Sequence, residues 1–192
     1  ANYAYDNRYL ASVTLRYDGS SRFGKNNRFG TFPAFSLGYR ISEEAYMEKT
    51  REWLSDLKLR FGWGQTGNQE TANTAVHTLY VTDYGMGDPT WTSLNGTSYD
   101  LTGKGGTSLP SGYKKVQQGN PDLKWETTTQ TNIGLDFGFF DQKLYGTAEY
   151  YIKKTKDILV QPPYLGIIGE GGYCWYNGAS MENKGFEVSL GY

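Results

Sequence analysis

The sequence is poor in the residues that most metal and enzyme sites need. Among 192 residues there is one cysteine, Cys174, and one histidine, His77. A single cysteine excludes an intramolecular disulfide framework, and a single histidine removes most zinc sites and most histidine-based catalytic schemes. We therefore predict no metal site, no cofactor, no catalytic residues and no enzymatic activity.

An excess of one charge and long apolar runs are lacking too. The 19 Lys and Arg nearly balance the 20 Asp and Glu, which argues against a nucleic-acid partner. No run approaches the roughly 20 apolar residues of a membrane helix. Yet a chain with a mean hydropathy of −0.63 contains 25 Gly, 17 Tyr, 9 Phe and 5 Trp. This combination is compatible with a transmembrane β-barrel, whose strands are apolar on one face only.

Apolar residues recur at every second position in six segments, which predicts an all-β chain without a long helix. Charged residues fall on the opposite face of these segments. A soluble sandwich gives this alternation with the polar row in water, whereas a membrane barrel places the apolar row in lipid and the polar row in a wet lumen. The six segments are 9–17, 31–40, 57–64, 125–139, 144–154 and 185–192.

The lengths of the connections favour the barrel. Segments 18–30, 67–121 and 157–180 all fall at one end of the predicted sheet, and the last two contain 55 and 24 residues. Long loops at one end and shorter turns at the other are typical of antiparallel outer-membrane barrels. In the turn 41–54 we expect a short helix with Ser42 as its N-cap. Aromatic residues near the strand ends would suit two interfacial girdles: Tyr9, Tyr17, Tyr39, Trp63, Trp125, Phe139 and Tyr192.

Several short segments, in order along the chain, resemble the SusC/RagA family of TonB-linked outer-membrane transporters of Bacteroidetes. Singly each is a weak match, but together they cover nearly the whole chain outside the two longest loops. They are DNRYL (6–10), RYDGSSRFG (16–24), NRFGTFP (27–33), GYRISEE (38–44), SDLKLR (55–60), GQTGNQ (64–69), NPDLKWE (120–126), EYY (149–151) and NKGFE (183–187).

The resemblance implies about six antiparallel strands of a larger, roughly 22-stranded up-and-down barrel in the bacterial outer membrane, in contact with its lipid. It also implies import of nutrients, oligosaccharides or peptides, with a SusD-like surface lipoprotein and energy from the TonB complex. Six strands are too few to close a barrel, since the smallest use about eight. We therefore expect residues 1–192 to be a single partial barrel domain, without a plug domain, a TonB box or a signal peptide.

Aromatic residues in the long loops are the candidate ligand contacts. Their flat faces can stack on sugars or on peptide side chains, although the same rings can also pack the loops against one another. We name Trp91, Trp175, Tyr173 and Tyr176 as ligand candidates. On the polar face, Arg40, Arg60, Glu126 and Glu149 are expected to line the lumen, where they set its field or bond to the plug.

Two alternatives stay open. A soluble all-β glycan-binding module would use the same loop aromatics on a sandwich. An outer-membrane hydrolase would depend on His77, but no second histidine and no Gly-x-Ser-x-Gly elbow accompany it. Cys174 is flanked by aromatic residues and is interpreted as a packing residue rather than a nucleophile.

Overall fold

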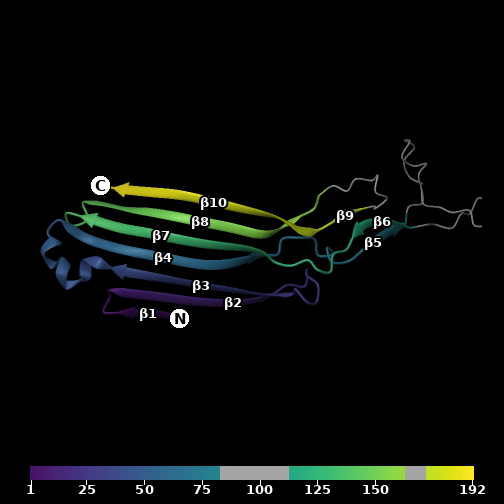
Figure 1. The fold of residues 1–192 in the computed structure, drawn as a ribbon, viewed down its shortest axis with the longest axis horizontal. Coiled ribbons are helices and arrows are strands. Elements are labelled where there is room, and N and C mark those ends of the chain that lie inside the picture. The colour runs from purple at the N-terminus through teal and green to yellow at the C-terminus, as the bar shows by residue number, and fades with distance from the viewer. Residues whose placement is uncertain (83–112, 163–171) are drawn as a thin grey trace, which may run out of the picture.

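A computed structural model describes residues 1–82, 113–162 and 172–192. Seven strands form one sheet in the order β1-β2-β3-β4-β7-β8-β10, and every neighbouring pair is antiparallel (Figure 1). All six predicted strands are present in this sheet. Its strands are β1 (Asn2–Tyr5), β2 (Tyr9–Gly19), β3 (Phe29–Arg40), β4 (Leu54–Asn68), β7 (Glu126–Phe139), β8 (Leu144–Val160) and β10 (Tyr176–Gly191).

Strand β1 was not predicted from the sequence, because its four residues are too few to show an alternating pattern. The turn that joins it to β2 contains Asp6 and Asn7 at φ 48° and 52°. Positive φ angles at both central residues of the four-residue turn 5–8 are typical of a type I′ turn, whose twist matches that of the flanking strands. The Arg8 N–H donates to the Tyr5 carbonyl at 3.0 Å and closes this hairpin.

A second, three-stranded sheet continues from the loop end of the large one (Figure 1). It contains β5 (Leu79–Thr82), β6 (Tyr113–Gln118) and β9 (Tyr173–Cys174). Strands β5 and β6 are antiparallel, whereas β9 pairs with β6 in parallel across a long separation in sequence. These strands have only four, six and two residues, too few for a clear alternation, and all three lie in segments that were predicted to be loops.

The long strands also extend further than their alternating segments. Strand β8 has 17 residues and β10 has 16. A barrel strand needs about 9–11 residues to cross a bilayer. The sheet therefore projects beyond the membrane-spanning zone, and the loops start at a distance from it.

The helix expected in turn 41–54 is present as two short 3₁₀ helices, η1 (Ile41–Glu43) and η2 (Ala45–Thr50). The prediction that Ser42 is an N-cap is wrong, because Ser42 lies inside η1 and is buried. Its hydroxyl donates instead to Asp56 on the neighbouring strand, at 3.4 Å. Within the described ranges, no helix is long and apolar enough to cross a membrane.

Three of the five buried apolar residues in the described ranges form one cluster at the loop end. Phe23, Ala75 and Leu123 are at most 1% exposed and come from three separate connections. We call this group, with the residues packed against it, the loop clasp. The partly buried members are Ala72, Val76, Trp125, Leu159 and Trp175.

Candidate functional site: two faces of a barrel wall and the loop clasp

One face of the large sheet is apolar and exposed. The cross-strand register places most of the apolar residues of the long strands on this face, as in the row Val13, Phe35 and Trp63. The small sheet does not cover it, because that sheet lies beyond the loop end (Figure 1). An exposed apolar surface of this extent needs apolar surroundings. Its exposed members include Tyr9, Val13, Leu15, Tyr17, Leu37, Leu59, Ile133, Tyr150, Phe186, Val188 and Leu190.

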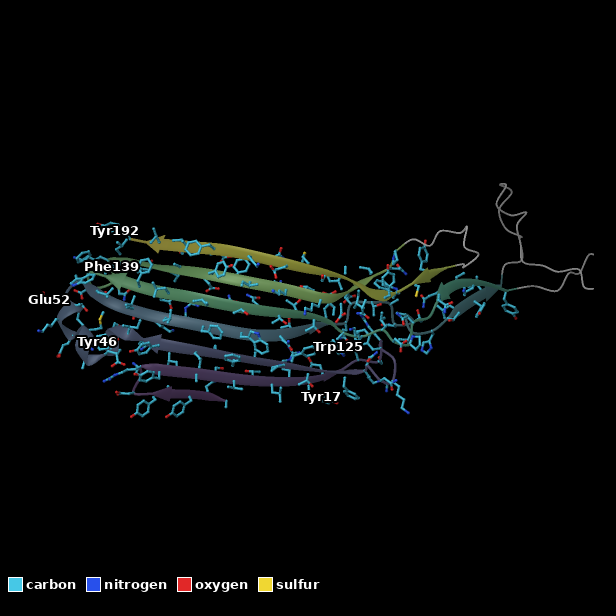
Figure 2. All side chains as sticks on the ribbon, viewed as in Figure 1. Tyr17, Tyr46, Glu52, Trp125, Phe139 and Tyr192 are labelled. Atoms are coloured by element: carbon cyan, nitrogen blue, oxygen red, sulfur yellow. The ribbon has the colours of Figure 1, made fainter. Side chains whose placement is uncertain are left out.

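Aromatic pairs border the apolar face at both ends. At the turn end, Tyr9 stacks on Tyr39 with ring centroids 5.1 Å apart. At the loop end, Tyr17 stacks on Phe29 at 5.2 Å. Figure 2 shows Tyr17 at one end of the sheet, with Phe139 and Tyr192 at the other. Aromatic rings at both borders are typical of the two interfaces of a membrane barrel.

Trp125 is the exception among the predicted girdle residues. Its ring lies 5.2 Å from Phe23 and 5.3 Å from Phe32, inside the loop clasp. Its indole N–H donates to the Arg28 carbonyl at 3.2 Å. Its assignment to a girdle was therefore wrong. Trp125 precedes β7, so the alternation of that strand does not set its direction.

The opposite, polar face carries an ion-pair network centred on Arg60. The Arg60 Nε lies 2.8 Å from the Asp136 carboxylate, and a terminal guanidinium nitrogen lies 3.3 Å from Glu149. Asn132 also donates to Glu149. Pairs between arginine and carboxylate combine charge with directional hydrogen bonds, which makes them stronger than neutral ones. One cation thus meets two anions on the polar face.

Gly134 explains how Arg60 reaches a strand that is not its neighbour. The register aligns Arg60 on β4, Gly134 on β7 and Glu149 on β8. A Cβ at position 134 would lie 2.9 Å from the Arg60 guanidinium. The absence of a side chain therefore opens the path across β7. No pattern within one strand reveals this relation, which depends on the pairing of three strands.

Only two of the four predicted lumen residues meet in this network. Arg60 and Glu149 pair directly, whereas Arg40 lies at the turn end, opposite Lys58 in the register. Glu126 lies at the loop end and accepts hydrogen bonds from Asn68 and from the Leu159 N–H, both at 3.2 Å. The four residues are thus spread over the length of the sheet. Asp136, which completes the network, was not among the predicted lumen residues.

Next to the network the sheet is hollowed. A hollow of about 570 Å³ is lined by small residues, including Ser12, Ser36 and Gly62, and by Arg60 and Glu149. Small side chains leave room for another group to approach the backbone. The hollow and the charges beside it make this the candidate site on the polar face.

The segment NPDLKWE (120–126) builds the loop clasp. Leu123 is fully buried. The Asn120 side chain donates to the Trp175 carbonyl at 2.9 Å, and the Asn120 N–H donates to the Ala75 carbonyl at 3.1 Å. Asn177 both accepts from and donates to the Lys124 backbone, at 3.0 and 2.9 Å. This segment therefore ties the bases of two other connections together.

A third connection joins through Gly24 and Asn27. A Cβ on Gly24 would lie 2.0 Å from the Pro121 carbonyl oxygen, so only glycine fits there. The Asn27 amide donates to the Asp122 carbonyl at 2.9 Å. In the sequence these residues stood out only as part of the resemblance to a family, and their joint role in the clasp was not predicted. The signal present in the sequence was the clustering of Asn, Asp and Gly around Leu123 and Trp125.

The loop aromatics divide into packed and exposed residues. Trp175 is partly buried and packs against the clasp. Tyr173 and Tyr176 are 58% and 40% exposed. Trp91 lies outside the described residues. A role in ligand binding stays a prediction for all four.

Cys174 and His77, the two residues weighed as catalytic candidates, have no arrangement of partners that would activate them in the described ranges. Cys174 is half-buried, and burial raises the pKa of its thiol. The carbonyl of His77 accepts a hydrogen bond from Gln117. Across the described ranges, no group of three or more His, Cys, Asp or Glu residues is placed to hold a metal ion.

A twisted antiparallel sheet with one lipid-compatible face and one polar face defines a stretch of transmembrane β-barrel wall. Comparison with known families identifies which barrel. The family described as "TonB dependent receptor-like, beta-barrel" matches residues 1–192, and the chain belongs to it. This is a family of outer-membrane receptors and transporters, not of enzymes, which removes the hydrolase alternative.

Individual relatives place the chain within the SusC/RagA type. It is 40% identical to the TonB-dependent receptor SusC of Bacteroides thetaiotaomicron, covering 98% of this chain and 17% of that protein. It is 36% identical to the TonB-dependent receptor P39 of Formosa agariphila, covering 98% and 16%. The chain thus spans about a sixth of the length of these relatives. The predicted family, fold class and outer-membrane location are confirmed.

Solved structures of related proteins support the same family assignment. A structure of the RagAB peptide importer in its closed-closed state superposes with a TM-score of 0.78 at 31% identity, over 98% of this chain and 18% of that one. The siderophore receptor PirA of Pseudomonas aeruginosa gives a TM-score of 0.57 at 18% identity, over 98% and 29%. The second likeness shows the barrel fold alone.

Proposed function

We propose that this chain is part of the wall of a transporter that imports oligosaccharides or peptides across the outer membrane. A SusD-like surface lipoprotein assists it, and the TonB complex supplies the energy. The main support is the match to SusC and to the RagAB peptide importer over 98% of the chain. Since the chain covers 17–18% of those proteins, we assign the remaining strands, the plug and the TonB contact to other parts of the receptor.

The polar face is the lumen surface in this proposal. The pairs of Arg60 with Asp136 and Glu149 fix one positive and two negative charges halfway along the wall. Arg40 and Glu126 add charges near its two ends. These groups and the hollow beside them contact the plug at rest and the cargo when the plug moves.

Cargo first meets the loop end. The exposure of Tyr173 and Tyr176 supports them as stacking surfaces at the entrance, together with Trp91 and Trp175. The clasp holds the strand that carries Tyr173 at the base of the loops through the bond from Asn120 to Trp175. A fixed aromatic surface binds with a smaller entropic cost than a freely moving one.

Fractionation tests the barrel against the soluble glycan-binding module. The complete receptor and residues 1–192 alone are expressed, and outer-membrane and soluble fractions are compared. We expect only the complete receptor to insert and to migrate differently after heating, while the segment aggregates without detergent because its apolar face and two strand edges are open. A segment that stays soluble, monomeric and cooperatively folded would instead support the soluble module.

Uptake assays test the transport role. Cells that produce the complete receptor are given labelled oligosaccharides and peptides, with and without TonB. We expect TonB-dependent uptake of one class, reduced by Tyr173→Ala with Tyr176→Ala. The matched control is Tyr3→Ala, a tyrosine of similar exposure (64%) on the apolar face. Uptake at the same rate with and without TonB would refute the transporter proposal.

A further inference from the structure

The charged residues of the apolar face gather in one place. Along the seven strands of the large sheet, the register assigns charged side chains to this face only near the loop ends of β8 and β10. Everywhere else in the described sheet, that face carries apolar residues, Gly, Ser, Thr or Gln. The charged residues are Lys154, Lys156, Glu182 and Lys184.

The position of this group relative to the membrane follows from the apolar rows. On β8 the apolar side of the strand runs from Leu144 to Ile152, and Lys154 is the next residue on that face. On β10, Lys184 pairs with Ile152, directly beyond Phe186. A span of nine residues is what a tilted barrel strand needs to cross the hydrocarbon, about 9–11 residues. The charged group therefore begins where the hydrocarbon ends, at the level of the outer-leaflet headgroups.

The four side chains form a cationic surface. Glu182 lies between two lysines, with its oxygens 2.7 Å from the Lys154 Nζ and 2.5 Å from the Lys184 Nζ. This carboxylate keeps the two ammonium groups together, and each retains further N–H donors for a ligand. Three lysines and one glutamate leave a net charge of +2. The hydroxyl residues Thr127 and Thr129 pair with Lys156 and Lys154 on the same face.

We propose that this group, which we call the lysine collar, binds the phosphate of a glycolipid in the outer leaflet. Lysines are good ligands for phosphate, and a basic cluster at a membrane surface recognises anionic headgroups. Acyl chains of the same lipid would lie along the apolar face directly below, beside Ile152 and Phe186. This proposal needs only the outer-membrane location and does not depend on the cargo.

Native mass spectrometry of the complete receptor in mild detergent tests the proposal. The probes are lipid A with one phosphate and the same lipid with its phosphate removed. We expect the phosphorylated lipid to bind in preference, and the triple variant Lys154→Gln, Lys156→Gln, Lys184→Gln to bind it about 100-fold more weakly, since each lysine near an anionic surface contributes roughly fivefold. The matched control is Lys58→Gln with Lys153→Gln, two lysines of the polar face.

Glu182→Gln gives a test in the opposite direction, in case loss of three lysines impairs folding. Removal of the carboxylate of the lysine collar is expected to strengthen binding of the phosphorylated lipid about fivefold. Equal binding of both lipids, a triple variant that binds like the wild type, or an equal loss in the polar-face control would each overturn the proposal. Full displacement by millimolar orthophosphate would overturn the lipid as the source of the phosphate.

Discussion

The loop clasp is expected to unfold locally while the barrel wall stays folded, and the substitution Leu123→Ala tests this directly. Leu123 is fully buried and packs with Phe23 and Ala75, so truncation leaves a cavity among three connections. A buried Leu→Ala change costs about 2–5 kcal/mol. If the clasp opens as a local unit, this loss lowers the free energy of local opening rather than that of the whole barrel.

Hydrogen exchange of the complete receptor in detergent measures this effect by segment. A loss of 2–5 kcal/mol corresponds to roughly 30-fold to several-thousand-fold faster exchange. We expect this change at amides of the clasp, such as those of Asn120 and Leu123, whose N–H groups donate to Ala75 and Asn120. Amides in the middle of β4 and β7 should keep their exchange rates, because their ladder is formed by strand pairing.

Leu59→Ala is the matched control, because Leu59 lies on the apolar face and is 43% exposed. It removes the same atoms without creating a cavity in the clasp, so exchange of the clasp should not change. Equal acceleration in the strands and in the clasp would refute a separately opening unit. No acceleration in the clasp would refute its dependence on Leu123.

Three further predictions concern single side chains. Arg60→Gln should lower the free energy of unfolding of the receptor in denaturant by about 1–2 kcal/mol, because two carboxylates lose a partly exposed partner. Arg60→Lys should restore only part of this free energy, because lysine lacks the planar fork of arginine. Equal stability of the wild type and both variants would contradict the network. Asn7→Val should speed hydrogen exchange of β1 by destabilising its left-handed turn residue by about 1–2 kcal/mol, while Asn7→Gly should not. Because burial raises the pKa of the Cys174 thiol, its thiolate fraction at pH 8 is below that of a free cysteine. Iodoacetamide should therefore react more slowly with Cys174 than with a cysteine-containing peptide, and an equal rate would count against this burial.

The strands of the wall were predictable because lipid and lumen impose a period of two on every long strand. The rows that contain Val13, Phe35 and Ile133 carry that period clearly, and their segments all became strands. The strand ends were less predictable, since the alternation fades beyond the membrane while the hydrogen-bond ladder continues. This is why β8 reaches Val160 rather than ending near Lys154.

The candidate sites depend on relations that no single segment contains. Arg60 meets Glu149 only because Gly134 lies between them on a third strand. Trp125 looked like a girdle residue because it borders a strand, yet its neighbours Phe23 and Phe32 come from a distant part of the chain. The prediction for Ser42 failed for a similar reason, because its hydroxyl found a partner on β4 rather than in its own helix.

The closed base of the longest connection has an evolutionary consequence. Its two stems meet where the Gly119 N–H donates to the Thr78 hydroxyl and Gln117 donates to the carbonyls of Thr74 and His77. Once both ends are fixed, doubling the chain between them costs only about 0.6 kcal/mol of closure entropy. Insertions, deletions and exchanges between these stems therefore leave the barrel almost untouched. Related receptors can therefore differ in the length and sequence of this connection while the barrel wall that carries the connection stays the same.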